Sequence, residues 1–221
     1  MLPILTPPKF DLNELAKIQE QIAQKVSQRD SFRKLKSIAG CDISFAEGDL
    51  AYAACAVLNY NDLGLIKKRT VKVKLNFPYI PTFLAFRELE GMLKVLNGLE
   101  ADVYMVGAQG IAHPRRAGLA SHLGVLLNRP TLGVAKSRLY GEAKEPAKKR
   151  GAWSPLLEGI DTIGAALRTQ TGSKPVYVSV GHKLSLKTAV RIALETTREN
   201  RLPEPLRMAH DLATKGMRDK L

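Results

Sequence analysis

The stretch from Asp102 to Gly141 reads DVYMVGAQGIAHPRRAGLASHLGVLLNRPTLGVAKSRLYG. Two short apolar runs, at 103–106 and 131–135, enclose a polar loop and an apolar segment of helical length at about 118–128. Apolar runs that are bounded by Gly and Pro and separated by a helix are typical of a parallel βαβ unit. The stretch therefore predicts an α/β fold with a helix between two parallel strands.

Polar side chains follow both predicted strands. The loop 107–116 comes after the first strand, and Lys136 comes directly after the second. In sheets of this kind, ligand sites form beyond the carboxyl ends of the strands. We therefore expect one site at which five side chains converge: Gln109, His113, Arg115, Arg116 and Lys136.

The composition indicates a globular protein with a polyanionic partner. The chain has 221 residues, of which 45% are apolar and 25% charged, and its formal net charge is +13. That charge favours nucleic acid as the partner, with a generally basic surface as the alternative. We expect one domain over 1–221, acting as a cytoplasmic monomer with no membrane partner, because no apolar run could span a bilayer and Met1–Lys9 does not resemble a signal peptide.

The rest of the chain predicts a mixed sheet with helices on both faces. Asp11 and Glu14 form a capping-box pattern that opens a helix to about Arg29. Three antiparallel strands should follow, because their joins are short, and parallel strands should come after them. The expected elements are strands at 38–45, 51–59, 65–75 and 175–181, helices at 82–96, at 185–199 and after Pro205, and a basic surface loop at 142–153 that is either solvated or in contact with phosphate. Cys41 and Cys55 would lie opposite each other, as packed thiols in a cytosol or as a disulfide in a hyperthermophile.

Two acidic residues stand out before any comparison is made. Asp42 falls inside an apolar strand, where a buried carboxylate needs a partner because an unpaired charge is costly in a low dielectric. A metal ion, an arginine or a set of backbone amides would serve, and so would an edge position that water reaches. Glu88 falls on a predicted helix, where a glutamate is usually solvated and a functional carboxylate is the less common alternative.

The motifs around these residues resemble those of the endonuclease V family in order and in spacing. They are GCDISF at 40–45, PYIP at 78–81, FLAFRE at 83–88, GAQGIAHPR at 107–115, HLG at 122–124, PTLGVAK at 130–136, SVGHK at 179–183 and PEPLRMAH at 203–210. The resemblance implies a ribonuclease H-like fold and a DNA-repair nuclease that depends on Mg²⁺, with Mn²⁺ as a substitute. Its substrate would be DNA or RNA containing inosine, cleaved on the 3′ side one nucleotide beyond the lesion.

The resemblance also implies roles for individual residues. Asp42 would bridge a metal ion and phosphate, Glu88 would add a ligand, and His210 would be an outer or second-metal ligand. Lys136 would neutralise phosphate or help to position the attacking water, while His113 would orient its loop. Carboxylates that hold Mg²⁺ suit phosphodiester hydrolysis, because the reaction needs an activated water and charge stabilisation at the phosphate.

Gly107 departs from the family pattern, which has an aspartate at this position. We expect no neighbour to replace the missing acid, because Asp102 lies at the other end of the strand and Asp211 would need a shift of the final helix. The loss of one charged ligand weakens a hard-cation site. We therefore predict strongly reduced activity for this chain.

Recognition of the substrate is assigned by the resemblance to the loop 78–81. There Tyr79, flanked by Pro78, Ile80 and Pro81, would enter beside the damaged base so that the base leaves the stack. Without the resemblance, a tyrosine packed under a hairpin edge is the alternative. The extruded base would meet backbone amides near Gly110 and Ile111, and His113, Arg115 and Arg116 would also contact the nucleic acid.

Two other functions stay open. The same scaffold would serve as a module that binds inosine-containing nucleic acid without cutting it. A different enzyme of the same fold, such as a resolvase or an RNA-strand nuclease, would share the carboxylates but has no need of a loop that probes single bases. A glycosylase is disfavoured because it has no use for metal-binding carboxylates.

Overall fold

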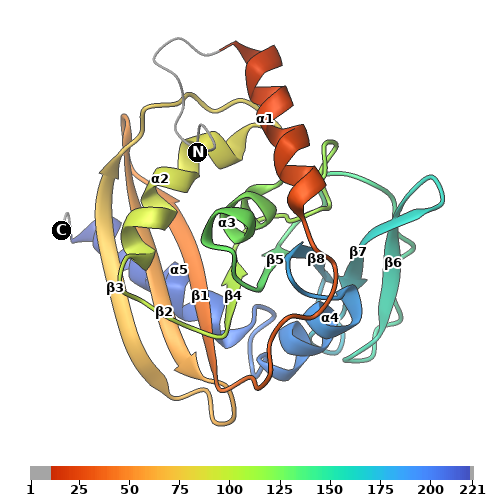
Figure 1. The fold of residues 1–221 in the computed structure, drawn as a ribbon. Helices are drawn as coiled ribbons and strands as arrows, with labels where there is room; N and C mark the ends of the chain where they lie inside the picture. The colour runs from red at the N-terminus through yellow and green to blue at the C-terminus, as the bar shows by residue number, and fades with distance from the viewer. Residues whose placement is uncertain (1–10, 220–221) are drawn as a thin grey trace.

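An eight-stranded sheet runs through the molecule, with the strand order β3-β2-β1-β4-β5-β8-β7-β6 (Figure 1). The computed structural model describes residues 11–219, so the prediction for Met1–Lys9 lies outside the described residues. The strands are β1 (Ser37–Phe45), β2 (Leu50–Asn59), β3 (Leu65–Lys74), β4 (Val103–Val106), β5 (Thr131–Ala135), β6 (Trp153–Glu158), β7 (Asp161–Leu167) and β8 (Val176–His182).

The central strands run in the predicted directions. β1, β2 and β3 are antiparallel, and β4 lies between β1 and β5 and is parallel to both. The last predicted strand, β8, is antiparallel to β5. The register of β1 on β2 places Cys41 opposite Cys55, with free, buried thiols whose Sγ atoms are 3.8 Å apart. The predicted mixed α/β sheet is confirmed.

The hairpin formed by β6 and β7 was not predicted. No strand was expected between Ala135 and Pro175, whereas β6 and β7 pair there and β7 also pairs with β8. Pro155 lies inside β6 and Gly164 inside β7. Both residue types weaken a strand pattern, and proline is tolerated in β6 because this strand is at the edge of the sheet.

Helices cover both faces of the sheet (Figure 1). Their bounds are α1 (Leu12–Lys25), α2 (Leu84–Leu96), α3 (Leu119–Leu127), α4 (Leu186–Glu195) and α5 (Glu204–Arg218). One apolar core lies between the sheet and α2 with α3, and the other between the sheet and α4 with α5. Side chains alternate along β1, so that Cys41 enters the core beneath α2 while Asp42 faces α5.

Two helices are shorter than expected, and beyond α1 hydrogen bonds to another segment take over. Asp11 caps the backbone N–H of Asn13 as predicted, but α1 ends at Lys25. Beyond it, the Ser27 N–H donates to Nδ1 of His182 and the Ser27 carbonyl accepts from Lys183. α4 likewise ends at Glu195, not near 199.

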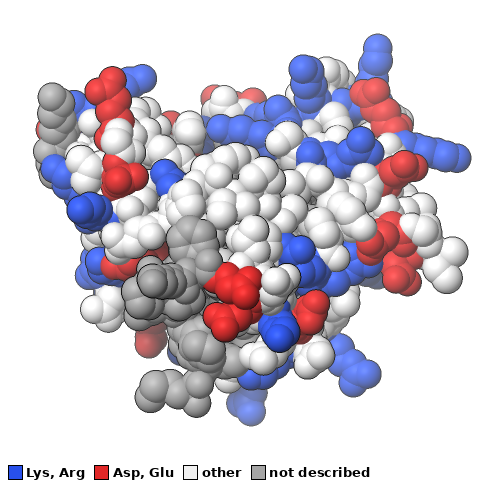
Figure 2. All heavy atoms as spheres, turned by 90° about the horizontal axis from the view of Figure 1, so that it is seen from above, with Lys and Arg blue, Asp and Glu red and all other residues white. Residues whose placement is uncertain are grey.

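Both edges of the sheet differ from a simple open strand. β3 carries five basic residues, namely Lys67, Lys68, Arg69, Lys72 and Lys74. β6 contains Pro155, and its Leu157 pairs through the backbone with Glu142. Seen from above, Lys and Arg side chains are scattered over the surface and are most numerous towards the side of β6 and β7 (Figure 2). Among residues 11–219, the helices are all too short or too polar to cross a membrane.

Candidate active site

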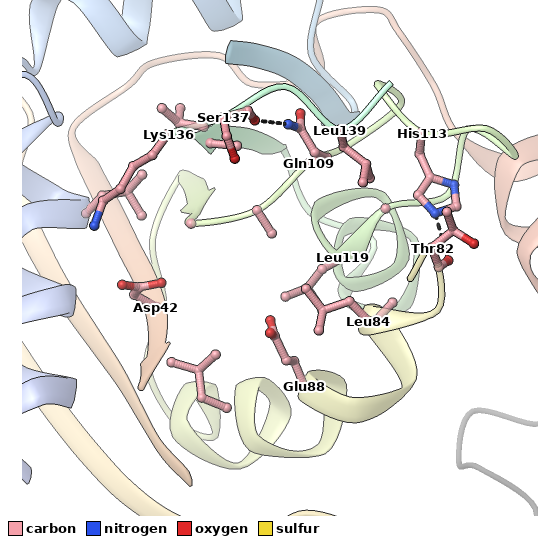
Figure 3. Close-up of a pocket in the computed structure, with 18 of the residues that line it drawn as sticks. Asp42, Thr82, Leu84, Glu88, Gln109, His113, Leu119, Lys136, Ser137 and Leu139 are labelled. Carbon is pink, nitrogen blue, oxygen red and sulfur yellow. Dashed lines mark hydrogen bonds between the residues drawn. The ribbon is translucent and has the colours of Figure 1, made fainter. Parts of the chain in front are cut away.

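A cavity of about 430 Å³ opens where the carboxyl ends of β1, β4 and β5 meet (Figure 3). Its walls come from segments far apart in the sequence: Asp42 of β1, 107–109 after β4, 136–139 after β5, Glu88 of α2, His210 of α5 and the loop 79–82. Because β1, β4 and β5 are parallel neighbours, their ends lie together at one edge of the sheet.

Asp42 is held by His210 at one side of the cavity. Its Oδ2 lies 2.7 Å from Nδ1 of His210. Burial raises the pKa of Asp42, while the hydrogen bond to His210 and the positive charge of Lys136 act in the opposite direction. The carboxyl group therefore has a fixed direction but only part of the charge compensation that a buried ionised group needs.

Glu88 faces the cavity from α2 without any such partner. It is 4% exposed, and its carboxyl group makes no hydrogen bond to any residue within 11–219. Burial raises its pKa to about 8, with a further contribution from the negative charge of Asp42, although Arg87 opposes the shift. Figure 3 shows both carboxyl groups pointing into the cavity. The negative charge of Asp42 thus disfavours ionisation of Glu88, and a cation bound to both carboxyl groups would relieve that repulsion.

The two carboxyl groups fit a cation that keeps several waters. Within the described part of the chain, no three His, Cys, Asp or Glu side chains are grouped closely enough to hold a metal ion by themselves. Mg²⁺ is commonly bound by one or two carboxylates, with water and substrate phosphate as the other ligands. Asp42 and the unpartnered Glu88 match that donor set.

Gly107 lies directly beside Asp42. A Cβ atom at this position would be 2.4 Å from Oδ1 of Asp42, so the carboxylate fills the space that a side chain would use. The backbone of Gly107 is not in the left-handed region, so a side chain would meet no strain from the main chain. Asp102 and Asp211 have partners away from this position: Asp102 accepts hydrogen bonds from the backbone of Lys36 and Ser37, and Asp211 pairs with Arg207.

Lys136 completes the polar side of the cavity and points towards Asp42 (Figure 3). The segment 136–139 is held by two side chains that donate to its carbonyl groups. Gln109 donates to Ser137, and Arg201 donates to both Lys136 and Pro175. The role of Arg201 was missed by the sequence analysis, because no local pattern marks an arginine that reaches across to another segment.

The loop 107–116 sends only part of its polar side chains to the cavity. His113 lines it, and Nε2 of His113 donates to the carbonyl of Thr82 at 2.8 Å. Burial lowers the pKa of His113 to about 4, so the ring is neutral near pH 7 and joins the two loops. Arg115 donates to Gln19 and Thr82 and lies over the ring of Phe83.

Arg116 is likewise engaged elsewhere. Its guanidinium pairs with Glu158 and Asp161 at the tip of the β6–β7 hairpin. Neither Arg115 nor Arg116 lines the cavity. The expected convergence of five side chains is therefore corrected to Gln109, His113 and Lys136.

Tyr79 stands at the rim of the cavity. It is 70% exposed and lies between Pro78 and Pro81, so it does not pack under a hairpin edge. The flanking Phe77 and Phe83 are buried against Phe86 and anchor the loop. An aromatic side chain that is held out on a proline-bounded loop is available to stack against a ligand.

The amides of Gly110 and Ile111 are already occupied within the protein. The N–H of Gly110 donates to Oγ of Ser179, and the N–H of Ile111 donates to the carbonyl of Val180. Neither residue lines the cavity. The structure therefore places these amides against β8 rather than facing the space where a base would enter.

The sheet order, with Asp42 towards the carboxyl end of β1 and Glu88 on the helix beside the same cavity, is that of a ribonuclease H-like α/β protein. The chain belongs to the endonuclease V family of nucleases, because the sequence model of that family, described as Endonuclease V, matches residues 20–211. The endonuclease V of Trichormus variabilis is 46% identical over 212 residues, which are 94% of this chain and 96% of the relative.

Solved structures agree with this assignment. The crystal structure of endonuclease V from Streptomyces avermitilis is similar with a TM-score of 0.91 and 35% identity, over 98% of both chains. Endonuclease V of Ciona intestinalis, in complex with a 24mer DNA that contains an inosine followed by a ribo-adenosine, has a TM-score of 0.82 and 31% identity, over 95% of this chain and 99% of that one. The predicted family and the predicted fold are both confirmed.

Proposed function

We propose that this chain is the scaffold of a metal-dependent endonuclease that recognises inosine in nucleic acid and hydrolyses the phosphodiester on its 3′ side, one nucleotide beyond the inosine. Membership of the endonuclease V family and the inosine-containing DNA bound by the Ciona relative support the substrate. The observation that carries the proposal is that Asp42 and Glu88 point into one cavity beside the exposed Tyr79.

The residues of the cavity have separate tasks in this proposal. Asp42 and Glu88 would hold Mg²⁺ or Mn²⁺, and His210 positions Asp42 through its hydrogen bond. Such a cation, when bound, would supply an activated water and charge stabilisation for the leaving oxygen. Lys136 offers its ammonium group to the phosphate from the side of the cavity that carries Asp42, and Tyr79 stacks in the gap that the displaced base leaves.

Gly107 lowers the activity of the chain in this proposal, because the cavity holds two acidic groups where the family has three. The test is to compare the unaltered chain with Gly107→Asp on matched inosine-containing DNA and RNA strands in Mg²⁺. We expect Gly107→Asp to restore nicking. Since Asp42 must turn to admit a side chain at 107, Gly107→Asn is the matched control: it has the same size but lacks the charge, and should restore little.

A module that binds inosine-containing nucleic acid without cutting it is the second candidate. Gly107 favours it, because a site with one acid fewer retains the cavity and Tyr79 but holds a cation more weakly. Specific binding by the unaltered chain, combined with equal and negligible cleavage by Gly107→Asp and Gly107→Asn, would favour the binding module. Cleavage restored by Gly107→Asp alone would favour the nuclease.

A further inference from the structure

Four neighbouring strands have one terminus at the edge of the sheet where the cavity opens: β5 and β7 end there, and β8 and β6 begin there. The registers place Ala135 opposite Tyr177, Leu167 opposite Val176, and Trp153 opposite Leu167. The segments after β5 and β7, and those before β8 and β6, therefore lie along one common edge. Since neighbouring strands are about 4.8 Å apart, the three gaps from β5 to β6 span roughly 14 Å.

Basic side chains follow this edge away from the cavity. Lys136 and Arg138 line the cavity after β5, Lys174 precedes β8, and Lys148 and Lys149 precede β6; we call these five residues the basic track. All five are exposed, and none forms an ion pair with another residue of the range 11–219. Five unpaired cations in sequence along one edge form a row of positive charge.

Hydrogen bonds join the members of the track into one continuous surface. The guanidinium of Arg201 donates to the carbonyls of Lys136 and Pro175, which connects the cavity wall to the residue after Lys174. The N–H of Gly172 donates to the carbonyl of Lys148, which connects the start of β8 to the turn before β6. The cations are thus neighbours through the backbone and not only in the order of the strands.

The backbone beneath the far end of the track is fixed by two arginines. Arg168 is 2% exposed, and it donates to the carbonyl of Pro146 at 2.7 Å and to the carboxylate of Glu145 at 3.0 Å. Arg150 donates to the carbonyls of Thr169 and Thr197. A buried guanidinium is expensive unless its donors are satisfied. Here its donors hold a surface turn in place, which an ordinary solvated loop does not require.

The acidic residue next to the far end of the track is already neutralised. Glu145 is paired with Arg168, whereas Glu158 and Asp161, which pair with Arg116, lie at the other end of the β6–β7 hairpin. Figure 2 shows Asp and Glu side chains among the Lys and Arg on the side of β6 and β7. The lysines of the track therefore remain available to an external anion.

We propose that the basic track binds consecutive phosphates of the nucleic-acid strand that leaves the cavity, along the edge from β5 to β6. The inference rests on the proposed function, since it assumes that the inosine is held at the cavity. The length of roughly 14 Å corresponds to about four nucleotides of one strand at about 3.4 Å each along a duplex axis.

The test compares two variants that lose the same charge. One is Lys148→Ala/Lys149→Ala/Lys174→Ala in the track. The other is Lys67→Ala/Lys68→Ala/Lys74→Ala on β3, which is the outer strand on the side of the sheet away from β6. The affinity of each for a fluorescent inosine-containing strand is measured by anisotropy at several salt concentrations. Each lost phosphate contact lowers the slope of log affinity against log salt by roughly 0.7 to 0.9, so the track variant should be shallower than the unaltered chain by about 2 to 3.

The β3 variant should keep the slope of the unaltered chain, and both variants should keep its thermal stability because the substituted lysines are exposed. A second measurement shortens the strand to two nucleotides on the 5′ side or on the 3′ side of the inosine. One of these two shortened strands lacks the phosphates that lie on the track. On that strand, the slope of log affinity against log salt should be the same for the track variant and the unaltered chain. Equal slopes for both triple variants on the long strand would overturn the track.

The result also separates the track from the proposed function. If the unaltered chain binds without preference for inosine but the track variant still loses slope, the proposed function fails and the track stands. If the unaltered chain binds no nucleic acid, both are overturned.

Discussion

Replacing Glu88 with Gln should stabilise the folded chain at neutral pH when no divalent cation is present. Burial raises the pKa of Glu88 from 4.5 to about 8. Between these values the folded protein retains a proton that the unfolded chain has released, so the free energy of unfolding falls as the pH rises through this window. For a shift of this size, the loss at pH 7 is on the order of 3 kcal/mol. Gln has nearly the same size and cannot ionise, so it avoids the loss.

Urea denaturation at pH 5, 6, 7 and 8 in the presence of a chelator would measure this effect. The advantage of Glu88→Gln over the unaltered chain should be small at pH 5 and should grow towards pH 8. Glu90→Gln is the matched control, because Glu90 lies on the same helix but is solvent-accessible and pairs with Lys94. A difference between Glu88→Gln and the unaltered chain that stays constant from pH 5 to pH 8 would refute the reasoning. Addition of Mn²⁺ at pH 8 should stabilise the unaltered chain and not the variant.

Two further residues give predictions of a different kind. Tyr79→Ala should reduce the preference for inosine-containing over intact strands while leaving thermal stability unchanged, because the side chain is 70% exposed; equal weakening of binding to both strands would contradict a role beside the base. His122 is 1% exposed, and burial lowers its pKa to about 4. Below pH 6.5 the unfolded chain therefore binds a proton that the folded chain does not, and the free energy of unfolding falls by an amount on the order of 2 kcal/mol at pH 5. His122→Gln should therefore lose less stability between pH 7 and pH 5 in urea titrations, and an undiminished loss would show that this histidine does not cause the acid sensitivity.

The sequence predicted the elements whose pattern is local. The apolar runs at 103–106 and 131–135 predicted the parallel pair β4–β5, and the short joins predicted the antiparallel pairing of β1, β2 and β3. Both signals depend on only a few residues. The β6–β7 hairpin was missed, since Pro155 interrupts its alternation. That omission led directly to a second one: the partners of Arg116 lie at the tip of this hairpin, and without them its guanidinium was expected at the cavity.

The chemistry of the site was predictable where it depends on one residue in its local sequence. It was not predictable where it depends on a contact between segments that are distant in the sequence. Asp42 was identified as unusual from its apolar strand, whereas Glu88 was singled out through the family resemblance, and the structure brings both to one cavity. The amides of Gly110 and Ile111 were expected to be free, but they pair with β8. Which acceptor a loop amide finds depends on how the loop lies over the sheet, and the sequence of the loop does not contain that information.

The two outer strands limit how copies of this protein could associate. The outer strand β3 carries five cations, which repel a second copy of the same strand. In the other outer strand, β6, Pro155 lacks the N–H donor that a new strand would need, and the backbone of Leu157 is already paired with Glu142. Backbone pairing with an additional strand is therefore disfavoured at β3 and at β6. Pairing of two copies strand against strand is disfavoured for the same reasons at both outer strands, which protects the protein from cross-β aggregation.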